Sequence, residues 1–176
     1  MNSIQTKRLV LLPHTLELIE AWAEDRSRFE ALLQTKPYGL QLEDWAQREM
    51  ENAFPYWKSM LKQFPSDAAW YAGWSIVLRN ENVAVGAMGF AAPPDAEGVV
   101  TVGYCIDLRH RNSGIASEAL NALCEWAFAY NRVQHIRATI PAWNGPSVKV
   151  AEKCGFVRSG TTVEEEMELL VFLRKR

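Results

Sequence analysis

The chain has 176 residues, of which 48% are apolar, enough for one domain to bury a continuous core without metal ions or disulfide bonds. Nineteen Lys and Arg residues stand against 21 Asp and Glu residues, a formal net charge of -2 that excludes a global positive field for nonspecific nucleic-acid binding. No apolar stretch is long enough to span a bilayer, and the polar start has no signal-peptide core. We therefore expect one cytoplasmic domain over residues 1–176, with no membrane or direct nucleic-acid partner.

The cysteine and histidine residues give no sign of a metal site. Cys105, Cys124 and Cys154 are far apart and form no CxxC pair, so we expect free thiols. The three histidines do not combine with a carboxylate at metal-ligand spacing. No metal is predicted.

The first third of the chain is expected to be mainly helical. Residues 7–12 favour a short strand that Pro13 ends, and Thr15 is placed to cap a helix with apolar residues on one face. A second amphipathic helix is expected over residues 42–64, with a possible interruption at Pro55.

The remaining elements predict an α/β domain built on a mixed sheet. Three β-favouring segments separated by turn signals predict successive antiparallel strands: residues 69–78, 83–91 and 99–107. A helix over 113–130, a strand over 135–140, a helix over 146–154 capped by Gly155, and a strand over 167–173 follow. This alternation after a meander predicts helices on both faces of the sheet.

The most specific local pattern is a hexapeptide between a predicted strand and a predicted helix: Arg111, Asn112, Ser113, Gly114, Ile115 and Ala116. A helix start leaves backbone N–H groups unpaired, and small residues such as Gly114 and Ala116 let a pyrophosphate approach them while Arg111 adds positive charge. The alternative is an ordinary helix start that Asn112 or Ser113 caps. The hexapeptide alone leaves both interpretations open.

The sequence resembles the GNAT superfamily of N-acetyltransferases, whose acetyl-CoA motif Gln/Arg-x-x-Gly-x-Gly/Ala is matched by Arg111, Gly114 and Ala116. Three further segments resemble the ribosomal-protein alanine N-acetyltransferase branch in the same order: TKRLVLLP, VGYCI and NGPSVKVAEKCGF. Walker A and Rossmann fingerprints are absent. The resemblance implies a β-α-α-β-β-β-α-β-α-β-β order with two splayed parallel central strands.

The same resemblance implies acetyl-CoA as cosubstrate, with its pantetheine arm between the strands at residues 99–107 and 135–140. The implied cofactor-binding residues are Tyr104, Cys105 and Ile106 along the arm, Arg111, Asn112, Ser113, Gly114, Ile115 and Ala116 at the pyrophosphate, and Ser117 and Asn144 nearby. Asn144 could also cap the following helix, and both roles can hold at once.

Departures from the family pattern bear on catalysis. Thr101 stands where the branch usually has a glutamate base, and Ala151 stands where many members have a tyrosine acid. Ser147, at the serine of the NxxS pattern, is the remaining hydroxyl for the leaving sulfur and is predicted to be catalytic. Asn112 replaces the usual glycine after the motif arginine. The chain also has an acidic run of Glu164, Glu165 and Glu166. These carboxylates could act as a base or bind the amine at the rim of the site, although such runs are more often simply solvated.

The missing base favours an acceptor that is easily deprotonated. Deprotonating an α-amine of pKa near 7.8 at pH 7 costs roughly 1 kcal/mol, against about 4.6 kcal/mol for a lysine near 10.4. We therefore expect a protein N-terminal α-amine, such as that of alanine or serine, as the acceptor. The enzyme is expected to be a monomer or a homodimer. The alternatives are a small amine (aminoglycoside, polyamine or amino acid) and a catalytically impaired acyl-CoA-binding module. Aromatic residues that could line the acceptor cleft, but are more often core, are Trp45, Trp57, Trp70, Tyr71 and Trp74.

Overall fold

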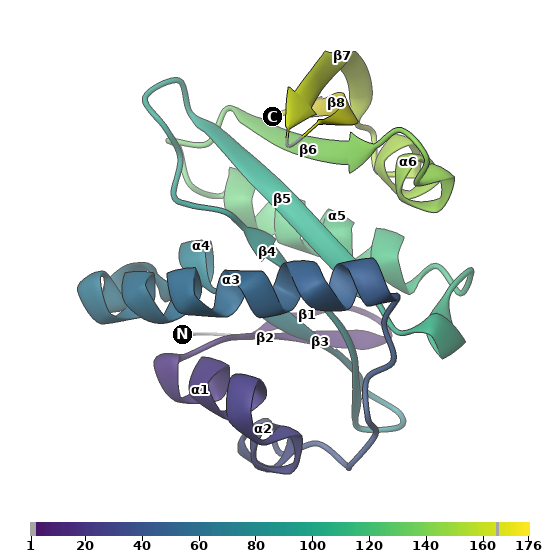
Figure 1. Ribbon diagram of the computed structural model, residues 1–176. Helices are drawn as coiled ribbons and strands as arrows, with labels where there is room; N and C mark the ends of the chain where they lie inside the picture. The colour runs from purple at the N-terminus through teal and green to yellow at the C-terminus, as the bar shows by residue number, and fades with distance from the viewer. Residues whose placement is uncertain (1–2, 165) are drawn as a thin grey trace.

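The computed structural model describes residues 3–164 and 166–176. Its strands form one mixed sheet in the order β1-β2-β3-β4-β5-β6-β8-β7 (Figure 1). The strands are β1 (Ile4–Gln5), β2 (Leu9–Pro13), β3 (Trp74–Leu78), β4 (Val83–Phe90), β5 (Val99–Ile106), β6 (His135–Pro141), β7 (Val157–Glu164) and β8 (Met167–Lys175). The helices are α1 (Leu16–Glu24), α2 (Arg26–Leu32), α3 (Asp44–Gln63), α4 (Ala68–Tyr71), α5 (Ile115–Phe128) and α6 (Gly145–Lys153), with 3₁₀ turns η1 (Pro65–Asp67) and η2 (Leu108–His110).

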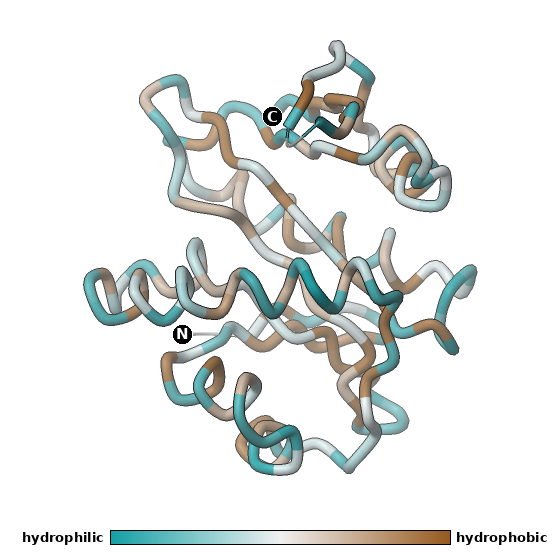
Figure 2. The backbone as a smooth tube through the Cα atoms, in the orientation of Figure 1, coloured by the Kyte–Doolittle hydropathy of each residue, from teal (hydrophilic) through white to brown (hydrophobic). Residues whose placement is uncertain are grey.

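The predicted mixed sheet with helices on both faces is confirmed. Alternate residues of β2 face opposite sides, as the two-residue period of a strand requires. Leu9 and Leu11 belong to the large core that α5 covers, whereas Val10 and Leu12 pack on the smaller core of α1 and α2. Figure 1 shows α5 behind the sheet and α3 in front of it. Hydrophobic positions concentrate in the central strands, while α3 alternates hydrophilic and hydrophobic positions (Figure 2).

The two central parallel strands splay apart, as expected. β5 pairs with β6 only at Val99↔His135, Val100↔Ile136 and Thr101↔Arg137. Beyond this point β5 continues against β4, and β6 continues against β8. Among the described residues, the β5 edge over 102–106 therefore has no strand partner on the β6 side, and its backbone groups are available to another molecule.

Several boundaries differ from the sequence prediction. Residues 69–71 are helical, in α4, and the strand begins only at Trp74, after the left-handed Gly73 (φ 72°). Trp70 packs its ring against Trp126 in the core, so its aromatic character reflects burial and not strand formation. The helix α2 was not predicted.

Two local predictions about the helices can also be checked. The Thr15 side chain accepts a hydrogen bond from Leu18 N at 3.3 Å, so the predicted cap is confirmed. α3 runs through Pro55 without the anticipated interruption. Pro55 is exposed, so water can satisfy the carbonyl that loses its helical partner. None of the described helices is both long and apolar enough to cross a bilayer.

Candidate active site

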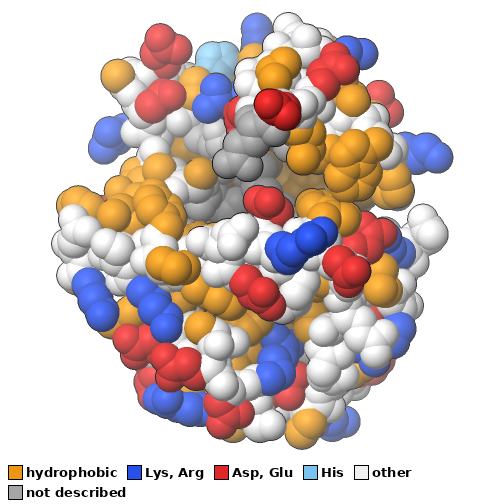
Figure 3. All heavy atoms as spheres, viewed as in Figure 1, with side chains coloured by type: hydrophobic (Ala, Val, Ile, Leu, Met, Phe, Trp, Pro, Cys, Tyr) orange, Lys and Arg blue, Asp and Glu red, His pale blue; other side chains and the backbone are white. Residues whose placement is uncertain are grey.

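A cavity of about 750 Å³ lies between α3, the sheet and the start of α6. Figure 3 shows the molecule hollowed there, with hydrophobic side chains on both sides of the hollow. The floor is made of small residues that pair across β4 and β5: Ala87 with Cys105 and Gly89 with Gly103. A Cβ atom added to Gly103 would have no neighbour within 4 Å, so this part of the floor is open space. The volume suits a small-molecule or chain-end ligand.

One face of α3 forms a wall of the cavity. Trp45, Glu49, Ala53 and Trp57 recur at four-residue spacing and all line it. At one end, the Tyr56 hydroxyl reaches across to donate to the backbone oxygen of Ala91 at 3.2 Å.

The other end of the cavity is bounded by two indole rings. Trp45 meets Trp143, in the β6–α6 connection, edge to face with 5.3 Å between ring centroids. Trp143 is 57% exposed although it lines the cavity, so this pair forms part of its rim. The cavity thus has aromatic residues at both ends of its α3 wall.

His14 lies at the buried side of the cavity and is neutral. Its Nδ1 lies 2.7 Å from Ala72 O and its Nε2 lies 2.8 Å from Ser75 Oγ. A carbonyl only accepts, so Nδ1 carries the proton and Nε2 accepts from the serine hydroxyl. Burial lowers the pKa of His14 to about 4. With both nitrogens engaged, His14 holds α4 against β3 and is not placed to take up a proton at neutral pH.

Two carboxylates line the cavity from different elements. Glu49 is an exposed residue of α3, and Glu164 is the last residue of β7. Of the acidic run singled out in the sequence, Glu164 thus lies at the cavity, Glu166 adopts a left-handed turn conformation with φ 65°, and Glu165 lies outside the described residues.

The start of α6 brings the predicted Ser147, Asn144 and Tyr104 together at the cavity. Asn144 Oδ1 accepts a hydrogen bond from Ser147 N at 3.2 Å, so its capping role is confirmed. The Tyr104 hydroxyl donates to Ser147 O at 2.9 Å, across the gap between β5 and α6. Burial raises the pKa of Tyr104 well above its usual 10, so this phenol stays protonated.

The cysteines are free, as predicted. Burial raises the pKa of Cys105, which lines the cavity, to about 11, and that of Cys124 to about 12. Both groups are therefore thiols and not thiolates at neutral pH, which makes Cys105 a poor nucleophile despite its location.

The backbone of the predicted pyrophosphate turn contains two left-handed residues. Asn112 (φ 58°) and Gly114 (φ 77°) are both left-handed, and asparagine tolerates this conformation better than most residues. Gly114 is the N-cap of α5 and no side chain caps the helix, so neither Asn112 nor Ser113 plays the capping role of the alternative interpretation. Ser113 instead donates its hydroxyl to His110 O. The first amides of α5 are left for another acceptor.

The remaining residues of this segment differ in accessibility. Ser117 is buried, and Ile115 is part of the main core. Arg111 is half-exposed, and its Nη1 lies 2.6 Å from Glu43 Oε1. The hydrogen bond from Arg111 and that from the Trp45 indole lower the pKa of Glu43.

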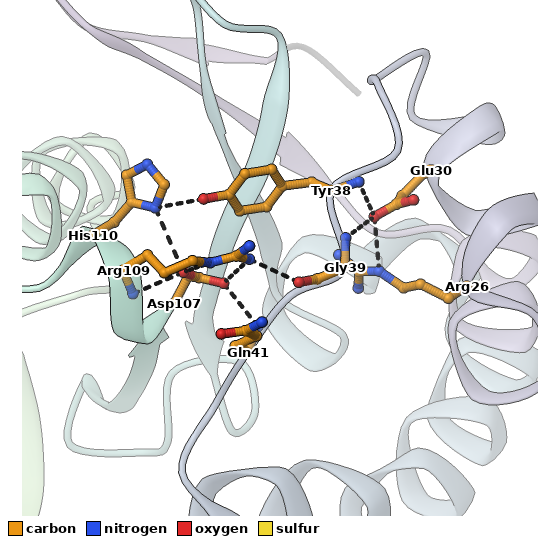
Figure 4. A network of polar contacts seen from close by, with 8 residues as sticks. All are labelled: Arg26, Glu30, Tyr38, Gly39, Gln41, Asp107, Arg109 and His110. Atoms are coloured by element: carbon orange, nitrogen blue, oxygen red, sulfur yellow. Dashed lines mark hydrogen bonds and ion pairs between the residues drawn. The ribbon is translucent and has the colours of Figure 1, made fainter.

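A polar network joins this turn to the segment that leads into α3 (Figure 4). Asp107, fully buried after β5, accepts hydrogen bonds from Gln41 N at 2.7 Å and from Arg109 Nε at 2.9 Å. Burial alone would raise the pKa of Asp107, but the hydrogen bonds from Arg109 and from the Gln41 amide outweigh it and lower the pKa to about 2. Tyr38 packs on Arg109 and its hydroxyl lies 3.2 Å from His110 Nδ1. The network fixes where α3 begins relative to the turn.

The structure shows what surrounds Thr101 and Ala151, the two positions that lack the family's usual catalytic groups. Thr101 lines the cavity, and its Oγ1 accepts a hydrogen bond from Arg137 Nε at 3.1 Å. Ala151 is fully buried in α6, where a tyrosine would require repacking of the core. Within the described residues, no group of three or more His, Cys, Asp or Glu side chains is placed to hold a metal ion.

The aromatic candidates from the sequence divide into two groups. Trp45 and Trp57 line the cavity, whereas Trp70 and Trp74 are core residues and Tyr71 stacks on Phe64 outside it. The sequence analysis did not identify several residues at the site, among them Glu43, Glu49, Tyr56 and Trp143. Glu49 carried a usable signal, since it interrupts the apolar stripe of α3 at four-residue spacing.

Comparisons with known proteins agree with this geometry. A family model described as an acetyltransferase (GNAT) domain matches residues 8–157. The uncharacterized N-acetyltransferase YjdG of Bacillus subtilis (strain 168) is 27% identical over 164 residues, covering 93% of this chain and 95% of that protein. The L-amino acid N-acetyltransferase AaaT of Escherichia coli (strain K12) is 35% identical over 68 residues, covering 39% of this chain and 42% of that protein.

A solved structure shares the fold over its whole length. RimL, a ribosomal L7/L12 alpha-N-protein acetyltransferase in complex with coenzyme A, superposes with a TM-score of 0.70 at 19% identity, over 99% of this chain and 98% of that one. At this identity the likeness shows the fold alone.

Proposed function

The chain belongs to the GNAT acetyltransferase family, and from that premise we propose that it transfers the acetyl group of acetyl-CoA to the α-amine of a peptide or protein N-terminus. The chain is an N-acetyltransferase, and the family uses acetyl-CoA. The observation that carries the proposal is the cavity itself, which joins the unpaired β5 edge to an acidic, aromatic wall on α3.

The residues on the cofactor side fit acetyl-CoA. The uncapped amides that follow Gly114 suit the pyrophosphate, and Arg111 adds a positive charge to the same turn. The free β5 edge at Tyr104, Cys105 and Ile106 suits the amide groups of a pantetheine arm, which can hydrogen-bond to it as a strand would. Asn144 lines the same cavity and caps α6 at Ser147.

The reaction needs an acid for the sulfur and an acceptor for the amine proton. The amine nitrogen bonds to the acetyl carbon, the carbon–sulfur bond breaks, the sulfur leaves as a thiol after taking one proton, and the ammonium proton is released. The Ser147 hydroxyl is assigned as the acid that protonates the departing sulfur, because Ser147 lines the cavity where β5 and α6 meet. Tyr104 positions this part of α6 through its hydrogen bond to Ser147 O.

The α-amine is favoured because the site has no strong base at the usual position. Thr101 occupies it and is held by Arg137. A neutral α-amine costs roughly 1 kcal/mol to form at pH 7, whereas a neutral lysine costs about 4.6 kcal/mol. Glu49 and Glu164 attract the ammonium form and can accept its proton on the way to solvent.

Thiol release tests the proposed function. The protein should release coenzyme A from acetyl-CoA when it is given a lysine-free peptide with a free N-terminus. It should not do so with the same peptide formylated at its N-terminus. Equal release from both peptides would show hydrolysis and not transfer. No release with any amine would support the acyl-CoA-binding module instead.

A further inference from the structure

The charge of the cavity lining is one-sided. Among the residues that the structure describes, its ionised side chains are the carboxylates of Glu49 and Glu164, and no Lys or Arg lines it. His14 contributes no positive charge near neutral pH, since burial lowers its pKa to about 4. The cavity therefore attracts an ammonium group and repels a carboxylate.

Two arginines contact residues that line the cavity without lining it themselves: Arg137 contacts Thr101, and Arg26 packs on the Trp22 ring. Arg137 Nε donates to Thr101 Oγ1 at 3.1 Å. Arg26 Nε pairs with Glu30 Oε1 at 3.1 Å, and its guanidinium packs on the Phe29 ring at 4.9 Å. Arg26 Nη2 is buried without a hydrogen-bond partner among the described residues, but neither arginine is one of the residues that line the cavity. The lining itself therefore offers no guanidinium to the carboxylate of a free amino acid.

The side chains that form the walls of the cavity are large and aromatic, whereas those on its floor are small. The α1 and α3 side is lined by Trp22, Trp45, Tyr56 and Trp57. On the sheet opposite them, Gly103 leaves open space. From Trp45 to Tyr56 the helix advances about 16 Å, so the α3 wall is long enough for an amine and a bulky substituent side by side.

Glu49 lies within this aromatic stripe. Trp45 lies one helical turn before it and Ala53 one turn after it on the same face. An ammonium bound by Glu49 is therefore next to the Trp45 ring, where cation–π attraction adds to the ion pair, and the small Ala53 leaves room for a neighbouring side chain.

We propose that this site selects α-amines whose first residue has a bulky apolar or aromatic side chain and whose carboxyl group is blocked by a peptide or amide bond, with Glu49 as the ammonium-binding residue. This inference rests on the proposed function and specifies its acceptor. It differs from the small first residues, alanine or serine, that the sequence analysis expects, and it excludes free amino acids as good acceptors.

The test compares matched acceptors with the full-length protein and acetyl-CoA. Phenylalanine amide should be acetylated with a kcat/KM on the order of tenfold or more above that of phenylalanine, because only the latter brings a carboxylate into the acidic cavity. Phenylalanine amide should also exceed alanine amide by on the order of tenfold, since burial of an aromatic side chain exceeds that of a methyl group. Equal rates in either pair would overturn the proposal.

A charge change at Glu49 tests the residue assignment. Glu49→Gln should raise KM for phenylalanine amide on the order of tenfold with unchanged coenzyme A affinity, and Glu49→Lys should narrow the gap between phenylalanine amide and free phenylalanine. Glu51→Gln, on the same helix but outside the cavity lining, is the matched control. An unchanged preference in Glu49→Lys would contradict the assignment.

Two further acceptors separate this inference from the proposed function. Phenethylamine has the aromatic group and no carboxylate, but it lacks a peptide carbonyl. If it is acetylated as fast as phenylalanine amide, the acceptor is a small arylalkylamine and the peptide assignment is overturned. Acetylation of a peptide only on lysine would overturn the proposed α-amine function. The ratio of kcat/KM for phenylalanine amide to that for alanine amide tests the preference for a bulky side chain separately.

Discussion

Arg111 and Glu43 form an ion pair, with 2.6 Å between Arg111 Nη1 and Glu43 Oε1. The other carboxylate oxygen of Glu43 accepts a hydrogen bond from the Trp45 indole, so one side chain connects the turn before α5 to the cavity wall on α3. In the proposed cofactor site, a pyrophosphate at this turn would compete with Glu43 for Arg111.

This competition predicts that Glu43→Gln binds coenzyme A more tightly. Exposed ion pairs contribute ~0.2–1 kcal/mol, so the dissociation constant should fall by up to about fivefold in calorimetry at low salt. Asp44→Asn, next to Glu43 and with the same change of net charge, serves as the control and should have a smaller effect. Weaker binding in Glu43→Gln would mean that Glu43 supports the cofactor site and does not compete with it.

Substitutions at Gly114 test the phosphate cradle. Gly114 is left-handed, and a Cβ atom there would meet only the end of the Arg8 side chain, at 3.5 Å. Gly114→Trp should weaken coenzyme A binding on the order of tenfold or more by occupying the space in front of the α5 amides. Gly114→Asn tolerates the same backbone with a small side chain and should bind nearly normally. Normal binding by a folded Gly114→Trp variant would remove the cradle assignment.

Ser147→Ala should lower turnover and leave cofactor affinity nearly unchanged. If the hydroxyl protonates the departing sulfur, kcat should fall on the order of tenfold while the coenzyme A dissociation constant stays the same. The backbone amide and carbonyl of residue 147 keep their bonds to Asn144 and Tyr104 in this variant, so the start of α6 is preserved. Full turnover would assign proton transfer to water or to another group.

The buried His14 predicts a specific pH dependence of stability. Its folded-state pKa is about 4, below the usual 6.5, so between these values the unfolded chain binds a proton that the folded chain excludes. The stabilisation is complete above pH 6.5 and is lost as pH falls toward 4, by about 3 kcal/mol in all. Urea unfolding at several pH values should show this loss, and His14→Asn should flatten the curve although it lowers stability overall. An equally steep curve in the variant would exclude His14 as its source.

The parts of the site that were predictable from sequence are local ones. The turn before α5 lies within the contiguous segment from Arg111 to Ala116, so the sequence could place the helix start there, while its pyrophosphate-binding role stays a prediction. The mixed sheet also followed from element order, because hairpin turns and strand–helix alternation are short-range signals.

The acceptor wall was less predictable because it is assembled by packing. Trp45 and Trp143 are 98 positions apart and meet only because α3 and the β6–α6 connection border the same cavity. The aromatic content at Trp70 predicts a strand, whereas the structure has a short helix there, with Trp70 packed on Trp126 and the strand starting after the left-handed Gly73. Periodicity does not distinguish a core aromatic residue from one that lines a cavity.

The most direct measurement of the central claim is a competition within one peptide that begins with phenylalanine and carries a single internal lysine. After incubation with the protein and acetyl-CoA at neutral pH, fragmentation mass spectrometry should find the acetyl group mainly on the N-terminal amine, and the rate should rise through the neutral range as that amine loses its proton. Acetylation mainly at the lysine Nζ would contradict the account and would require a strong base in the cavity, with Glu49 and Glu164 the first to be examined.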